Sequence, residues 1–258
     1  MTSLKDSVAK LNAALSSPPQ DIIKILAPSG TLRAGINLSN FLLVSGEEEN
    51  GDPVGVSPSL ASVLGDVIGC DVEYIGFSSP GKVADAAKEN AWDIGNIGAD
   101  PARAKFISFT DAYCEIEATF IVREGSALED FRQIDQPSVR IATKKRAAYA
   151  LWLERHIQQA ELVQFDSIDA SYDGFMDRGI DVLAGLRPRL LDDVERDDSL
   201  KLLPGRFMAV QQAIGTPKDR GDEVLEFLRG FVDHAKTSGL IAALIEHHGM
   251  TGRLSVAG

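Results

Sequence analysis

Residues 91–113 read AWDIGNIGADPARAKFISFTDAY, and this stretch decides the fold. It contains a predicted strand at 93–97, then a turn with a proline, then a second extended run. On both sides of it, short apolar runs with a period of two alternate with segments of helical spacing. Strands that alternate with helices in this way imply parallel strands joined by crossover helices. We therefore expect an α/β fold.

The alternation is interrupted twice, at 113–124 and at 207–214, where the sequence predicts long extended segments. The other predicted elements are strands at 32–36, 72–75, 139–143, 161–165, 180–185 and 200–203, and helices at 58–68, 80–90, 145–159, 168–178, 189–196, 221–237 and 239–248. Two α/β units joined by two extended segments fit this order, and a single doubly wound sheet fits it nearly as well.

The N-terminal residues 3–16 predict an amphipathic helix, because apolar residues recur at helical spacing from Leu4 to Leu15 with charges between them. Ser3 is its expected N-cap. A secretory signal would instead have a basic start and an uninterrupted apolar run. We expect the helix to be retained and to pack on the rest of the chain or on a second copy in a homodimer. The expected location is the cytoplasm, or the periplasm only if a signal peptide has been removed.

The composition and the absence of certain motifs argue against several classes of partner and cofactor. The 26 Lys and Arg against 38 Asp and Glu give a net charge of −12, which disfavours nucleic acid. Neither common glycine-rich phosphate loop is present, and the four histidines lack the spacing of metal ligands, so we expect no cofactor and no metal. Cys70 and Cys114 are expected to be buried free thiols, and Trp92 and Trp152 to be core aromatics.

The segment from Asp100 to Tyr113, together with the preceding WDIGNIGA, resembles the family-3 extracellular solute-binding proteins, which are amino-acid-binding periplasmic binding proteins of type II. Further similarities lie at 30–35 (GTLRAG), at Gly55 with the helix after it, at 178–181 (RGID) and at 238–241 (SGLI). Ser57 and Pro58 stand where that family usually has acidic residues. The resemblance covers about 28–250.

This resemblance implies a two-lobe fold in which each lobe is a mixed, mostly parallel sheet with flanking helices, and two hinge strands join the lobes. Lobe 1 would comprise 28–114 plus 214–258, and lobe 2 would comprise 118–206. Residues 1–27, an amphipathic helix and a linker, lie outside it. A ligand would bind in the cleft between the lobes and be enclosed by hinge closure.

The resemblance also implies ligand-binding residues in lobe 1. Arg103 falls on the arginine that binds the ligand carboxylate, and a guanidinium suits this role because two parallel N–H donors match two carboxylate oxygens. Asn96 and Gly98 fall where the family lines the same lobe. Asn40 and Ser79 stand where the family often stacks aromatic rings on the ligand. The alternatives are a surface turn for Arg103 and a strand-end role for Asn96.

In lobe 2, the charges of this sequence differ from those that are usual in the family. Where the family presents a Gly-Thr pair at a helix start, this chain has Thr143, Lys144, Lys145 and Arg146. The acidic residue that usually pairs with the ligand ammonium falls on Leu186, which is followed by Arg187. A solvated basic patch would also explain 143–146. If the residues are functional, these changes favour a small organic anion over a zwitterionic amino acid.

Three functions are therefore open. The first is a non-catalytic binding protein for a small anionic metabolite, with a membrane transporter subunit as partner if the protein is exported. The second is a cytosolic enzyme on the same scaffold, of the cyclohexadienyl dehydratase type, in which Glu115 or Glu117 would act as acid or base on a carboxylate substrate. Hinge ion pairs are the more common use of such residues. The third is a cytosolic sensor or partner subunit.

Overall fold

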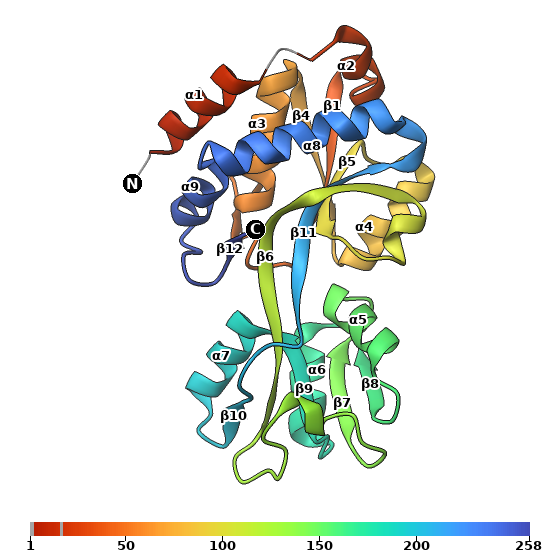
Figure 1. The fold of residues 1–258 in the computed structure, drawn as a ribbon, viewed down its shortest axis with the longest axis vertical. Coiled ribbons are helices and arrows are strands. Elements are labelled where there is room, and N and C mark those ends of the chain that lie inside the picture. Colours follow the sequence, from red (N-terminus) through yellow and green to blue (C-terminus); the bar gives the residue numbers. More distant parts are fainter. Residues whose placement is uncertain (1–2, 16–17) are drawn as a thin grey trace. The chain divides into compact units, whose positions relative to one another are not determined.

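The computed structural model describes residues 3–15 and 18–258. It divides into two compact units (Figure 1): unit 1 comprises Met1–Glu115 and Gln211–Gly258, and unit 2 comprises Ile116–Val210. The chain enters unit 2 along strand β6 (Ile107–Arg123) and returns along strand β11 (Met208–Pro217), so each of these strands supplies residues to both units. These two strands contain most of the two long extended runs of the sequence.

Unit 1 is built on a mainly parallel sheet with the strand order β4-β1-β5-β11, in which β4, β1 and β5 are parallel and β11 is antiparallel to β5. Its other elements are α1 (Leu4–Ala14), α2 (Gln20–Leu26), β1 (Thr31–Asn37), β2 (Gly46–Glu47), β3 (Pro53–Val54), α3 (Val56–Ile68), β4 (Asp71–Phe77), α4 (Pro80–Ala86), η1 (Ala87–Glu89), β5 (Ile94–Gly98), η2 (Arg103–Lys105), η4 (Lys218–Arg220), α8 (Asp222–Thr237), α9 (Leu240–His247) and β12 (Ser255–Val256).

Unit 2 is built on a second set of strands with the order β6-β9-β7-β8. Strand β7 is parallel to β8 and β9, while β6 is antiparallel to β9 and to β10. Its elements after β6 are η3 (Phe131–Gln133), β7 (Arg140–Lys144), α5 (Ala148–His156), β8 (Glu161–Phe165), α6 (Ile168–Asp177), β9 (Val182–Leu186), α7 (Arg187–Arg196) and β10 (Leu200–Leu202). In the described part of the chain, every helix is too short or too polar to cross a membrane.

The N-terminal segment belongs to unit 1. Helix α1 packs against α8 and α9, with Leu11 fully buried, and Ser3 caps it by accepting the Asp6 N–H. Helix α2 is tied to the unit by Arg220, which donates to the Ile25 carbonyl at 2.8 Å. The sequence did not predict α2, the β2–β3 hairpin or β12, because each is too short to show a clear period.

A row of glycines crosses the sheet of unit 1. Gly35 in β1 is in register with Gly95 in β5, which is in register with Gly215 in β11. The fully buried Trp92 ring lies against the first two of them, because a Cβ added at Gly35 or Gly95 would stand 2.9 or 3.0 Å from ring atoms. The expectation that Trp92 is a core residue is thus confirmed, while Trp152 is only partly buried.

Two other sequence expectations need correction. Helix α3 starts at Val56 with Gly55 as its N-cap, two residues before the predicted start at 58. Gly55 has φ +150°, and a Cβ there would lie 2.2 Å from the Leu43 carbonyl oxygen, so only glycine fits. Cys70 is half-buried, while Cys114 is buried, and both are free thiols.

We expect Gly35→Ala to destabilise the protein by about 1–3 kcal/mol, because the added methyl group must displace the packed Trp92 ring. Urea unfolding followed by circular dichroism measures this. Gly230→Ala in α8 is the matched control, since nothing lies within 4 Å of an added Cβ there. That substitution should be neutral or stabilising by up to about 1 kcal/mol. Equal stabilities of the two variants would contradict the packing described above.

Candidate functional site

The carboxyl ends of three parallel strands meet at one edge of the unit 1 sheet, which is where α/β proteins bind ligands. Asn40 follows β1, Ser79 follows β4, and Gly98 ends β5. Arg103 comes five residues later, in η2. The structure therefore brings these four sequence-predicted residues to one edge of one unit.

Arg103 is the buried cation of this edge, with only 5% of its surface exposed. Its Nη1 donates to the Gly98 carbonyl at 2.6 Å, which fixes the guanidinium beside the end of β5. The turn between them is set by Asp100, whose Oδ1 accepts the Ala102 N–H at 2.8 Å. Burial of an arginine requires polar partners, so its position is strongly constrained.

Asn96 belongs to a buried polar cluster next to this edge. Its Nδ2 donates to the Ser57 carbonyl at 3.4 Å, and the Ser57 hydroxyl lies 2.9 Å from the Tyr113 hydroxyl. Burial raises the pKa of Tyr113, so this hydroxyl stays protonated. Sequence reasoning missed Ser57 and Tyr113 as site-shaping residues, although Tyr113 closes the motif that identified the fold.

Asn40 and Ser79 use their side chains within local turns. The Asn40 Oδ1 accepts the Leu42 N–H at 3.3 Å, and the Ser79 Oγ caps α4 by accepting the Lys82 N–H at 3.3 Å. Neither side chain offers a flat surface for stacking. The sequence-based inference that the ligand body is not held between aromatic rings at these positions remains a prediction.

In unit 2, the basic segment 143–146 does not start a helix, contrary to expectation. Arg146 has φ +60°, a left-handed conformation that a right-handed helix cannot include, and α5 starts only at Ala148. Lys145 is exposed and pairs with Asp166 at the surface. Thr143 and Lys144 therefore end strand β7, and Lys145 and Arg146 form the turn after it, so the segment has one buried and two exposed cations and is not a basic helix start.

Lys144 is the buried cation of this segment, and its burial lowers the pKa of its amine. It ends β7, at the carboxyl edge of the parallel strands of unit 2. The preceding Thr143 is fully buried, and its Oγ1 has no hydrogen-bond partner among the described residues. Thr143 and Lys144 thus belong to β7, while Lys145 and Arg146 come after the end of the strand.

Leu186 and Arg187 lie at the end of the neighbouring strand β9 and the start of α7. Glu117 on β6 pairs with two guanidinium groups at once: its Oε2 is 2.6 Å from Arg187 Nε, and its Oε1 is 3.2 Å from Arg206 Nη1. Arg187 also donates to the Gly205 carbonyl. Glu117 is thus an ion-pair partner, and the cluster carries one net positive charge. Glu115 lies opposite Ser255 in the β6–β12 ladder.

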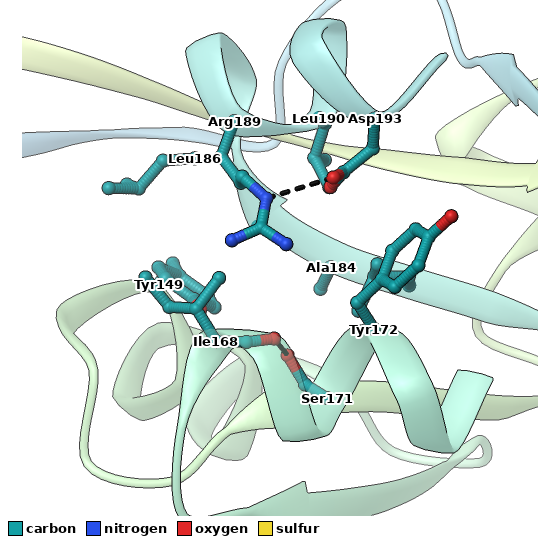
Figure 2. Close-up of a pocket in the computed structure, with 11 residues that line it drawn as sticks. Tyr149, Ile168, Ser171, Tyr172, Ala184, Leu186, Arg189, Leu190 and Asp193 are labelled. Carbon is teal, nitrogen blue, oxygen red and sulfur yellow. Dashed lines mark hydrogen bonds and ion pairs between the residues drawn. The ribbon is translucent and has the colours of Figure 1, made fainter. Parts of the chain in front are cut away.

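A small cavity lies inside unit 2 between α5, α6, α7 and β9 (Figure 2), and sequence reasoning did not find it. Arg189 reaches into it, and its Nε donates to Asp193 Oδ1 at 2.9 Å while its Nη1 donates to Asp169 Oδ1 at 2.7 Å. Leu186 and Tyr149 line the same cavity. No sequence motif marks this cavity, because its residues come from separate elements.

Asp193 is the buried carboxyl of the cavity, with 4% of its side chain exposed. Burial raises the pKa of Asp193, and the bond to Arg189 only partly opposes this. The folded protein therefore binds this proton at a higher pH than the unfolded chain does, so acidification through that range favours the folded state at this residue.

We expect wild-type protein to gain stability relative to Asp193→Asn as the pH falls from 7 toward about 4, near the ordinary aspartate value. Urea unfolding of both proteins across that range measures the difference. Asp169→Asn is the matched control, because Asp169 pairs with the same arginine but is 79% exposed. A loss of relative stability on acidification would show that the Arg189 pair, and not burial, dominates the Asp193 environment.

The model of one protein family, "Bacterial extracellular solute-binding proteins, family 3", matches residues 32–251 of the chain. A search of curated proteins found no match. Among solved structures, the solute receptor for L-cysteine of Neisseria gonorrhoeae superposes with a TM-score of 0.73 at 17% identity, covering 92% of this chain and 99% of that one. The fold is therefore that of type II periplasmic binding proteins.

Two further structures show the same fold. The amino acid ABC transporter substrate-binding protein AbpA of Streptococcus pneumoniae, bound to L-arginine, gives a TM-score of 0.71 at 17% identity, with 89% of this chain and 99% of that chain covered. An ancestral amino-acid-binding protein, a precursor of cyclohexadienyl dehydratase, gives 0.68 at 19% identity, with coverage of 88% and 98%.

Proposed function

The chain belongs to the family-3 bacterial extracellular solute-binding proteins, and on this premise we propose that it binds a small organic carboxylate by closure of its two units on the ligand. The observation that carries the proposal is Arg103, a buried guanidinium held by Gly98 at the carboxyl edge of parallel strands. A guanidinium can bind a carboxylate through two parallel N–H groups.

Unit 2 supports an anionic rather than a zwitterionic ligand. Leu186 cannot pair with an ammonium group, and the nearby Glu117 is already engaged by Arg187 and Arg206. Recruiting Glu117 for an ammonium would break one of these ion pairs and leave a guanidinium without its carboxylate. The buried Lys144 adds a further donor suited to an anion.

The first turns of two helices in unit 2 also favour an anionic ligand. Helices α5 and α7 both begin without a side-chain cap among the described residues, at the ends of the neighbouring strands β7 and β9. The first N–H groups of a helix are unpaired unless a cap, water or ligand accepts from them, and they carry partial positive charge. Two such helix starts near Lys144 and Arg187 favour anions.

We propose binding and not catalysis. The enzymatic alternative requires a carboxyl group free to exchange a proton with the substrate. Both oxygens of Glu117 are held by arginines, so neither is available to a substrate. The geometry thus favours the hinge ion-pair role for Glu117.

We expect Arg103→Ala to weaken carboxylate binding by about 30-fold to several thousand-fold, because a buried charge-assisted contact is lost. Isothermal titration calorimetry with the acid identified below measures this. Lys105→Ala is the matched control: it lies in the same short helix but is exposed, and should bind normally. Wild-type affinity in Arg103→Ala would refute the proposed carboxylate site.

The ligand itself can be identified by native mass spectrometry of protein purified without denaturation. The proposal expects a co-purified organic acid that is released when the protein is denatured. The purified protein should also leave that acid chemically unchanged on incubation. Conversion to a product would instead support the dehydratase-type alternative.

We further propose that the protein acts in the cytoplasm with α1 retained, because α1 is docked on α8 and α9 as part of unit 1. Intact-mass analysis and cell fractionation of the native host should then find residues 1–27 present and the protein in the cytoplasmic fraction. Recovery of a shortened chain from the periplasm would contradict this, and would make a membrane transporter subunit the expected partner. A homodimer through α1 remains a prediction; a monomer by native mass spectrometry would refute it.

A further inference from the structure

The cavity of unit 2 borders both proposed ligand-binding segments of that unit. Leu186, at the end of β9, lines it directly. Tyr149 also lines it, and a backbone hydrogen bond from Lys144 reaches the Tyr149 hydroxyl, opposing the rise that burial causes in its pKa. The cavity thus shares Leu186 with the proposed ligand-binding residues and touches Lys144 through Tyr149.

The chemistry of the cavity is set by Arg189. Its Nε and Nη1 are held by Asp193 and Asp169, which fix the plane of the guanidinium. Within the described residues, its Nη2 has no recorded hydrogen bond, and Figure 2 shows the group directed into the cavity between Tyr149 and Tyr172. An arginine can only donate, so an acceptor atom placed there would pair with Nη2.

The other polar groups of the cavity accept hydrogen bonds. Asp193 supplies carboxylate oxygens, and Ser171 donates its hydroxyl hydrogen to the Ile168 carbonyl at 2.6 Å, which leaves its lone pairs to accept. The cavity has room for about one water molecule. One small group that both accepts and donates fits these partners, and a second carboxylate is too large.

We infer that this cavity is a specificity pocket for a hydroxyl group of the ligand, with Arg189 as the residue that recognises it, so that the protein prefers hydroxy acids to the corresponding deoxy acids. The inference rests on the proposed carboxylate function and names its substrate class. A hydroxyl group can take the place of a bound water molecule there and keep its hydrogen bonds. A deoxy ligand cannot form hydrogen bonds with Arg189 and Asp193, so it loses their contribution to binding.

The test is calorimetry with two matched pairs of acids, lactate against propionate and malate against succinate. The hydroxylated member should bind about 10-fold to 100-fold more tightly in at least one pair, since unmade buried hydrogen bonds are costly. Arg189→Lys should reduce that preference to less than about threefold. Arg196→Lys, on the exposed end of the same helix, is the matched control and should keep the preference.

Ser171→Ala tests the inference independently if Arg189→Lys does not fold. This variant too should reduce the preference for the hydroxy acid. Equal affinities within each pair, together with binding that is lost in Arg103→Ala, would overturn the inference and leave the proposed function standing. A preference that persists in Ser171→Ala and in a folded Arg189→Lys would also overturn it. Failure of all four acids to bind would contradict the proposed function and the inference together.

Discussion

The Asp93 carboxylate is buried in unit 1 and accepts hydrogen bonds from Arg33 and Arg220, which come from distant parts of the sequence. Its Oδ1 lies 2.8 Å from Arg33 Nη2 and 2.7 Å from Arg220 Nη2, and its Oδ2 accepts the Arg33 backbone N–H. Loss of one member of a buried pair typically costs about 3–5 kcal/mol. The adjacent Trp92 packs on the glycine row, so two consecutive residues fix the start of β5. The Gly98 and Arg103 positions depend on that strand.

Much of this arrangement could be predicted from the sequence. The strand and helix alternation reflects the burial of parallel strands, and the stretch that ends in Tyr113 matches a pattern that also fixes the Arg103 turn. The predicted strand at 161–165 coincides with β8. Arg103, Asn96 and Gly98 are identified through the resemblance to the solute-binding family, and the structure places Gly98 and Arg103 at one edge of the unit 1 sheet.

The charges of unit 2 could not be predicted in the same way. The sequence shows Lys144, Lys145 and Arg146 as three equivalent cations. The fold buries the first, pairs the second with Asp166 and gives the third a left-handed backbone. The Glu117 cluster joins residues separated by up to 89 positions, so no local pattern encodes it. The Arg189 cavity is likewise a product of tertiary packing between three helices and a strand.

The proposed preference for an anion rests on Leu186 and on the net positive Arg187–Glu117–Arg206 cluster, neither of which offers a partner to an ammonium group. The most direct measurement is a calorimetric comparison of succinate with aspartate and of propionate with alanine, since each pair differs only by the amino group. The account predicts that the acid without the amino group binds more tightly in both pairs, because an ammonium would face Leu186 and the Arg187–Glu117–Arg206 cluster. Tighter binding of the amino acids would contradict it.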